Sequence, residues 1–76
     1  MKEKILAVIA DSIKVDKRML SENLSIGDIP EWDSMGNLCI IRNIEEAFDI
    51  DIPMDDLFEL TSVKSIIAEV NKLKQK

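Results

Sequence analysis

The sequence contains no histidine and only one cysteine, Cys39. Histidine is the usual general base near neutral pH, the usual partner of a serine or cysteine nucleophile, and the commonest metal ligand. A lone cysteine cannot form an intrachain disulfide or a multi-cysteine metal site. These absences argue against an enzyme and against a metal site, although carboxylates alone could still supply acid–base chemistry.

Glycine, proline and long apolar runs are also scarce. Two Gly and two Pro in 76 residues leave little room for extended disorder. No apolar run approaches the ~20 residues that span a bilayer. Asp11 and Lys14 interrupt the N-terminal stretch "MKEKILAVIADSIKV", so we interpret it as mature structure of a cytoplasmic protein and not as a signal peptide. We expect one domain over residues 1–76, and a monomer.

Positive charge is nearly absent from the middle of the chain. Residues 21–62 carry eleven acidic side chains and a single base, Arg42. Such a surface would repel the phosphates of nucleic acid. It favours protein partners with a basic face, mainly through the association rate and specificity.

What the sequence does contain is helical periodicity. Ile5, Ile9 and Ile13 recur every four residues and predict a helix over 2–15. Residues 16–33 lack this periodicity and contain turn residues, so they predict a long loop in which a short helical turn can form over 17–21. Five apolar side chains of the loop are expected to tuck under it: Met19, Leu20, Leu24, Ile26 and Ile29.

The second half predicts three more helices. One runs from Ser34 to Phe48, with Cys39 as a partly buried member. Its apolar face has Leu38 at its edge and is made of Ile40, Ile41, Ile44, Ala47 and Phe48. The "DIDIP" stretch, 49–53, has no strand to pair with and is expected to be an extended connector. "MDDLFEL" predicts a short helix over 55–60 that buries Leu57, Phe58 and Leu60.

The last helix follows a cap at Thr61 or Ser62 and repeats apolar residues at Val63, Ile66, Ile67, Val70 and Leu73. The fold class is therefore all-α: a bundle of three main helices and one short helix, with a long loop between helices one and two.

The pair Asp33-Ser34 at the start of the second helix has two interpretations. Both residue types are good helix caps, because a side-chain oxygen can accept a bond from a free backbone N–H. One cap is enough, however, and the other oxygen would stay free. A hydroxyl at a helix N-terminus lies where exposed N–H groups and the macrodipole favour an anion such as a phosphate ester.

The C-terminal end of the same helix is acidic. Its negative charges interact unfavourably with the helix macrodipole, at a cost of ~0.3–1 kcal/mol per exposed group. The acidic residues are Glu45, Glu46 and Asp49. This acidic end is either a solvated face or a docking surface for basic partners.

The stretch "WDSMGNLCIIRNIEEAFDIDIP" resembles the centre of acyl and peptidyl carrier proteins, and the resemblance extends over nearly the whole chain. In that family, an Asp-Ser-Leu motif opens the second helix and a Glu-rich end with a Phe closes it. The resemblance implies that Ser34 carries 4'-phosphopantetheine, attached from coenzyme A by a separate phosphopantetheinyl transferase that recognises Asp33. The thiol of the arm, and not Cys39, would hold an acyl or aminoacyl group as a thioester.

The resemblance also implies partner enzymes that load and transfer the acyl group through basic docking faces. Met35, Glu45, Glu46 and Asp49 are the candidate contacts, and Met35 is equally well explained as a residue closing the end of the bundle. Four residues depart from the pattern of the fatty-acid carriers: Met35, Gly36, Asn37 and Arg42. By contrast, Trp32 and the Met-Gly pair are typical of freestanding specialised carriers. The alternatives are a fatty-acid carrier, a D-alanyl carrier and an unmodified helical interaction module.

Overall fold

The structure is a computed structural model and describes residues 2–74; Met1, Gln75 and Lys76 of the expected 1–76 domain lie outside the described residues. Its helices are α1 (Lys2–Ile13), the 3-10 turn η1 (Lys17–Met19), α2 (Ser34–Phe48), α3 (Met54–Leu57) and α4 (Val63–Lys74). The described residues add one isolated antiparallel bridge, between Ser25 and Ser62. The predicted all-α class and the predicted order of elements are confirmed.

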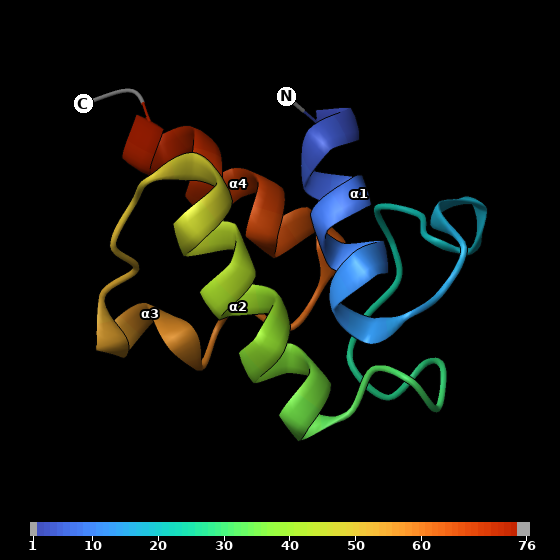
Figure 1. The fold of residues 1–76 in the computed structure, drawn as a ribbon. Coiled ribbons are helices and arrows are strands. Elements are labelled where there is room, and N and C mark those ends of the chain that lie inside the picture. The colour runs from blue at the N-terminus through green and yellow to red at the C-terminus, as the bar shows by residue number, and fades with distance from the viewer. Residues whose placement is uncertain (1, 75–76) are drawn as a thin grey trace.

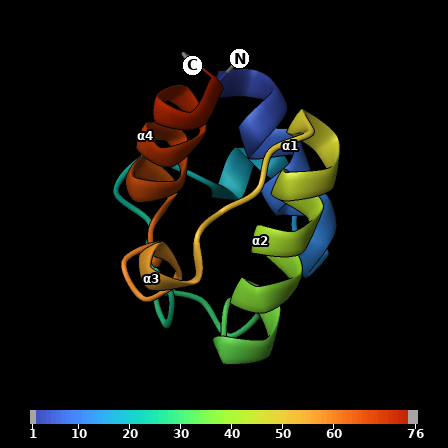
Figure 2. The same cartoon turned by 90° about the vertical axis from the view of Figure 1, so that its left-hand side faces the viewer.

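Helices α1 and α2 run antiparallel and pack against each other, with α4 beside them (Figure 1). Isoleucine, leucine and valine stripes meet between them, because these side chains recur at helical spacing on one face of each helix. The side chains that are most completely buried are Ile5, Ile9, Trp32, Ile40, Ile44, Val63, Ile66 and Val70. The connector from α2 passes down beside α4 to the short helix α3, which lies across from the first half of α2 (Figure 2).

The long loop between α1 and α2 is attached to the turn before α4. The Ile26 N–H donates to the Thr61 carbonyl at 2.8 Å, and the Val63 N–H donates to the Leu24 carbonyl at 3.0 Å. Leu20 is buried, and Leu24, Ile26 and Ile29 pack against the core as expected. Met19 does not, because it ends the 3-10 turn and faces solvent.

Two helix boundaries differ from the prediction. The first helix ends at Ile13 and not at residue 15, because Lys14 takes a left-handed conformation with φ 61°. The third helix, predicted over 55–60, spans Met54–Leu57, which is a single turn. The start of α2 at Ser34, its end at Phe48 and the extended connector after it are as predicted.

Besides that of Met19, three burial predictions are wrong. Cys39 is exposed, because it lies on the side of α2 opposite the residues that face α1 and α4. Ala47 is also exposed, at the edge of a hollow between α1 and α2. Phe58 was expected in the core, but α3 ends one residue before it and its ring is in solvent.

Candidate functional site

The turn that leads into α2 is organised around Asp33 and Gly36. The Asp33 carboxylate accepts a hydrogen bond from the Gly36 N–H at 2.8 Å and is the N-cap of the helix. A Cβ on residue 36 would lie 2.9 Å from the Glu31 carbonyl oxygen and 3.1 Å from a methyl carbon of Ile13. Glycine is therefore required here by a close approach of two backbone segments, at the expense of some helix propensity.

A buried hydrogen-bond link then ties this turn to the segment between α3 and α4. The Trp32 indole N–H donates to the Asn37 side-chain oxygen at 2.9 Å, and the Asn37 amide donates to the Leu60 carbonyl at 3.0 Å. Trp32 is fully buried and Asn37 nearly so. Because buried polar groups are costly without partners, this link fixes the first turn of α2 against the segment before α4.

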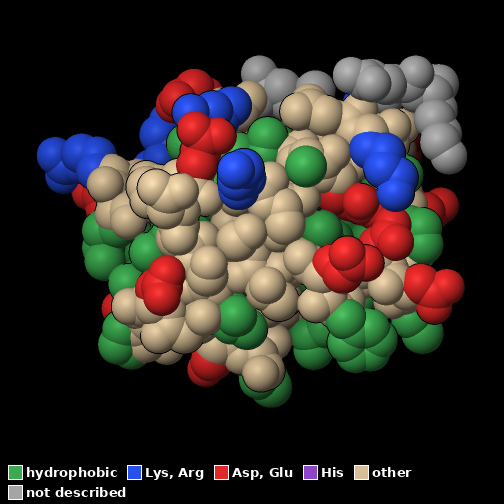
Figure 3. Space-filling model, turned by 180° about the vertical axis from the view of Figure 1, so that it is seen from behind, with side chains coloured by type: hydrophobic (Ala, Val, Ile, Leu, Met, Phe, Trp, Pro, Cys, Tyr) green, Lys and Arg blue, Asp and Glu red, His purple; other side chains and the backbone are tan. Residues whose placement is uncertain are grey.

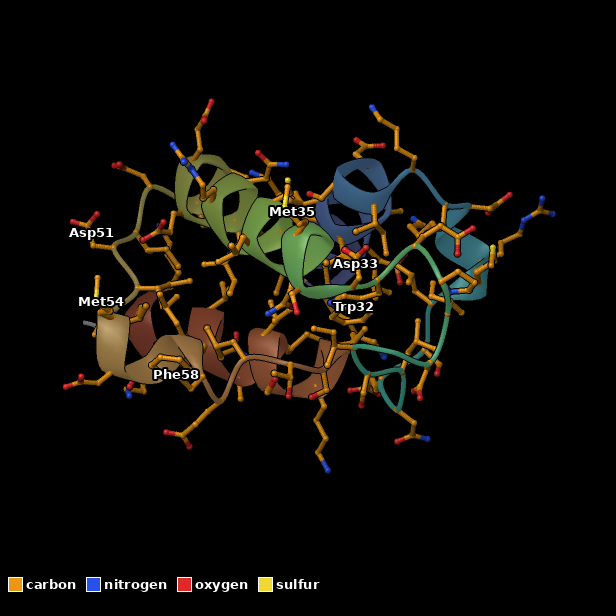
Figure 4. All side chains as sticks on the ribbon, turned by 90° about the horizontal axis from the view of Figure 1, so that it is seen from below. Trp32, Asp33, Met35, Asp51, Met54 and Phe58 are labelled. Atoms are coloured by element: carbon orange, nitrogen blue, oxygen red, sulfur yellow. The ribbon has the colours of Figure 1, made fainter. Side chains whose placement is uncertain are left out.

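Ser34 and Met35 do not take part in this hydrogen-bond network. Both are exposed at the first turn of α2, where Figure 4 looks directly onto Asp33, Trp32 and Met35. Within residues 2–74, the Ser34 hydroxyl takes part in no hydrogen bond, since Asp33 provides the cap. A free hydroxyl therefore lies next to the N–H groups at the start of a 15-residue helix.

Ser34 also lies on the wall of an apolar hollow, which we call the α2–α3 groove. Its volume is about 460 Å³. Ser34, Leu38 and Ile41 line it from α2, and Met54, Leu57 and Phe58 line it from α3 and the turn that follows. A second hollow, of about 370 Å³, adjoins Ser34 on the side of the loop and is lined in part by Pro30 and Trp32.

The acidic end of α2 lies about 21 Å from Ser34 at 1.5 Å per residue. Glu45 is partly buried there, and its carboxylate accepts a hydrogen bond from the Ile52 N–H at 2.8 Å. Glu46 is exposed over the hollow between α1 and α2, and Asp49 is the left-handed C-cap with φ 53°. Although Glu45 opposes the macrodipole of α2, its carboxylate therefore has a structural role, because it holds the connector to α3.

Two lysines offset the negative charge at this end of α2. The Lys74 ammonium donates to the Phe48 carbonyl at 3.2 Å, and the Lys4 ammonium lies 5.0 Å from the centre of the Phe48 ring. Cations are favourable at a helix C-terminus and over an aromatic face. The end of α2 is therefore held by α1 and α4 together.

A separate acidic cluster joins α3 to α4. The Lys72 ammonium lies 3.6 Å from an Asp56 carboxylate oxygen and 3.9 Å from a Glu69 one. Glu69 is only 8% exposed, and its other oxygen has no partner among the described residues. Burial raises the pKa of Glu69 above its ordinary value, and the neighbouring carboxylates of Asp56 and Glu59 raise it further.

Two properties concern the whole of the described chain. Residues 2–74 bring together no group of three metal-binding side chains. None of the helices in the same range has the length and hydrophobicity that a membrane crossing would require.

This arrangement of helices is the fold of a carrier protein. It superposes on the solution structure of the holo acyl carrier protein from Geobacter metallireducens with a TM-score of 0.85 and 22% identity, covering 97% of this chain and 85% of that one. The predicted resemblance in fold is thereby confirmed.

Sequence comparison identifies the family. The family described as "Phosphopantetheine attachment site" matches residues 3–70. The acyl carrier protein of Syntrophobacter fumaroxidans is 32% identical over 74 residues, which are 97% of this chain and 91% of that protein. The bikaverin polyketide synthase of Gibberella fujikuroi is 34% identical over 64 residues, which are 84% of this chain but 3% of the synthase.

The chain therefore belongs to the phosphopantetheine-binding acyl carrier proteins. It is a non-catalytic carrier whose acyl group is held on a phosphopantetheine arm. The family depends on separate enzymes: a phosphopantetheinyl transferase that attaches the arm, and acyl-transfer enzymes that use it.

Proposed function

We propose that this chain is a freestanding carrier whose phosphopantetheine arm is attached to the hydroxyl of Ser34. One observation carries the proposal: Ser34 is exposed at a helix start where Asp33 already makes the cap. The fold therefore has no need of this hydroxyl. Asp33 is also the proposed recognition residue for the transferase, while residues 1–76 act as one monomeric, cytoplasmic carrier domain.

The residues around Ser34 fit a phosphodiester. The N-terminal end of α2 favours its negative charge by ~0.3–1 kcal/mol, and the exposed oxygen is accessible to an enzyme. When bound, the arm supplies the thiol that holds an acyl or aminoacyl group as a thioester. The chain itself would position that thiol and present it to partners.

We further propose a specialised pathway over housekeeping fatty-acid synthesis. Asn37 and Gly36, which depart from the fatty-acid carriers, are both committed to packing here: Asn37 bonds to Trp32, and Gly36 lets Glu31 approach. As a result, the first half of α2 contains no acid. The acids proposed for partner docking, Glu46 and Asp49, are confined to the far end of α2.

Met35 is the proposed contact nearest the attachment point, because it is exposed directly beside Ser34. Glu45 is also a proposed docking residue, but only through one carboxylate oxygen, because the other accepts a hydrogen bond from the Ile52 N–H. Enzymes with basic faces would then approach from Ser34 and from the acidic end of α2.

The attachment is tested by mass. Purified unmodified protein is incubated with coenzyme A and a transferase of broad substrate range, and the intact mass is measured. We expect the wild-type chain to gain one phosphopantetheine and the Ser34→Ala variant to gain none. Either an unchanged wild-type mass or a gain that survives the substitution would refute the proposal.

The pathway is tested by loading. A specialised aminoacyl carrier should be charged by an amino-acid-activating adenylation enzyme and served poorly by a fatty-acid malonyl transferase. Efficient malonyl loading would instead support the fatty-acid role. Selective charging with D-alanine would identify a D-alanyl carrier.

A further inference from the structure

The segment that contains α3 is fixed firmly at both of its ends. Before α3, the Ile52 N–H donates to the Glu45 carboxylate at 2.8 Å. After α3, the Leu60 carbonyl accepts from the Asn37 amide at 3.0 Å. Ile52 and Leu60 are also buried in the core. The single turn of α3 lies between these two points, and its position depends on contacts of its own.

Two contacts hold the turn of α3 in place. Leu57 is half-buried and packs against the core. The Asp56 carboxylate lies 3.6 Å from the Lys72 ammonium on α4 and within hydrogen-bond range of the Glu69 carboxylate. Within residues 2–74, no other ion pair or side-chain hydrogen bond joins α3 to another helix. The seat of α3 on α4 therefore depends on the charges of this cluster.

The hydrogen-bonding capacity of Glu69 is not satisfied while its side chain is ionised. One of its oxygens lies 3.9 Å from the Lys72 ammonium, which is too long for a hydrogen bond, and the other is buried with no partner among the described residues. An ionised carboxylate accepts hydrogen bonds and donates none, so two of them cannot bond to each other. A proton on Glu69 supplies the missing donor to Asp56 and removes one of the two facing charges.

The charged groups that face Glu69 determine when this proton is held. They are Asp56 from α3, Glu59 from the turn after α3 and Lys72 from the next turn of α4. Burial and the two acids outweigh the single base, so the pKa of Glu69 lies above its ordinary value. Figure 3 shows red acidic side chains gathered next to blue basic ones on the side of the molecule where α3 and the end of α4 lie. Glu69 therefore loses its proton at a higher pH than an ordinary glutamate does.

We propose that Asp56 and Glu69 form a proton-dependent latch that closes α3 onto α4 and sets the width of the α2–α3 groove. With the proton in place, the two side chains share a hydrogen bond and α3 stays against α4. When the proton leaves, two like charges face each other with one lysine between them, and α3 moves away. Because Leu57 and Phe58 line the groove from this side, the groove beside Ser34 then widens.

The latch is tested by an NMR titration of the unmodified chain from pH 4 to 8. The signals followed are the carboxyl carbon of Glu69 and the methyl groups of Leu57 and Ile41, which line the groove from α3 and from α2. We expect all of them to shift together, with one midpoint above the ordinary value of about 4.3. Glu69→Gln should hold both methyl signals at their low-pH positions, because glutamine stays neutral and can still donate to Asp56. Glu46→Gln, at an exposed site on α2, is the matched control and should leave the shifts intact.

Two further variants should move the midpoint in opposite directions. Lys72→Met removes the cation that favours the charged form of Glu69, so the midpoint should rise. Asp56→Asn removes a facing negative charge, so the midpoint should fall. The latch is refuted if Glu69 titrates at or below about 4.3, if the Leu57 shift persists in Glu69→Gln, or if Leu57 stays unchanged while Glu69 titrates. The measurement uses the chain without its arm, so none of these outcomes bears on the attachment at Ser34.

Discussion

The carboxylate of Asp33 accepts the hydrogen bond that starts α2, and this leaves the neighbouring hydroxyl of Ser34 outside the capping network. The sequence allowed either oxygen to be the cap. An unmodified interaction module would need Ser34 only as a cap, and that task belongs to Asp33 here. The two residues can therefore be separated by mutation.

Asp33→Ala should lower the free energy of unfolding by about 1 kcal/mol, because the Gly36 N–H loses its acceptor. Ser34→Ala should change it by less than about 0.5 kcal/mol, as is usual for a surface substitution. Urea unfolding of both unmodified variants, followed by circular dichroism, measures the difference. An equal loss in the two variants would mean that the caps are shared.

The link between Trp32 and Asn37 should be measurable by a double-mutant cycle. Trp32→Phe removes the indole N–H and leaves the buried Asn37 oxygen without a donor, at a cost of about 1–3 kcal/mol. In an Asn37→Ala background, the same change should cost about 1 kcal/mol less, because the acceptor is already gone. Additive effects would show that Trp32 contributes by packing alone.

At the scale of elements, α3 is a single turn whose attachment to α4 depends on Asp56, Glu69 and Lys72. The raised pKa of Glu69 favours its protonated form, which can donate to Asp56 across the two helices. Protonated Glu69 therefore contributes to the stability of the fold, and this contribution is fully present below the pKa of an unfolded glutamate, about 4.3. It is lost as the pH rises through the raised pKa of the folded state.

Glu69→Gln should therefore be more stable than wild type at pH 7, because glutamine stays neutral and its amide can still donate to Asp56. The difference in free energy of unfolding should shrink as the pH falls toward 4. Urea unfolding from pH 4 to 8 measures it, and Glu46→Gln, at an exposed site on α2, is the control. A constant offset at every pH would show that the charge of Glu69 does not matter.

The elements differ in how well the sequence predicted them. The bounds of α2 were exact because its periodic face and its polar start coincide at Asp33 and Ser34. The end of α1 was not, because nothing in the residue type marks the left-handed conformation of Lys14. Phe58 was placed in the core because hydrophobicity alone cannot show where a one-turn helix stops.

The sequence predicted only those parts of the candidate site that a local motif marks. Ser34 and Asp33 were marked by the motif, and Trp32 and Asn37 were noted only as departures or markers of a subclass. Their hydrogen bond could not be foreseen, since it depends on how the loop folds back over the first turn of α2. The groove was missed for the same reason, because α3 and α2 meet only in three dimensions.

At the scale of the whole molecule, the core is closed. Its fully buried side chains are mostly isoleucine and valine, whose branched Cβ atoms restrict their rotamers. The groove beside Ser34 is open to the surface and apolar, so it offers an acyl chain a place without repacking the core.

An octanoyl-loaded form should therefore differ from the unloaded holo form in the methyl shifts of groove residues such as Leu38, Ile41 and Leu57. The methyl groups of Ile5, Ile9 and Val70, which are fully buried, should stay unchanged. Methyl-labelled NMR spectra of the two forms measure this. Shifts at Ile9 and Val70 would mean that the bundle opens to take in the chain.

The start of α1 and the end of α4 lie at the pole of the bundle opposite the start of α2 (Figure 1). A group could be joined beyond either helix, such as a solid support, an affinity tag or a neighbouring domain. It would lie on the side of the molecule that faces away from Ser34. An attachment at that end would therefore leave the start of α2 accessible, and successive enzymes could reach the loaded thiol without meeting the attached group.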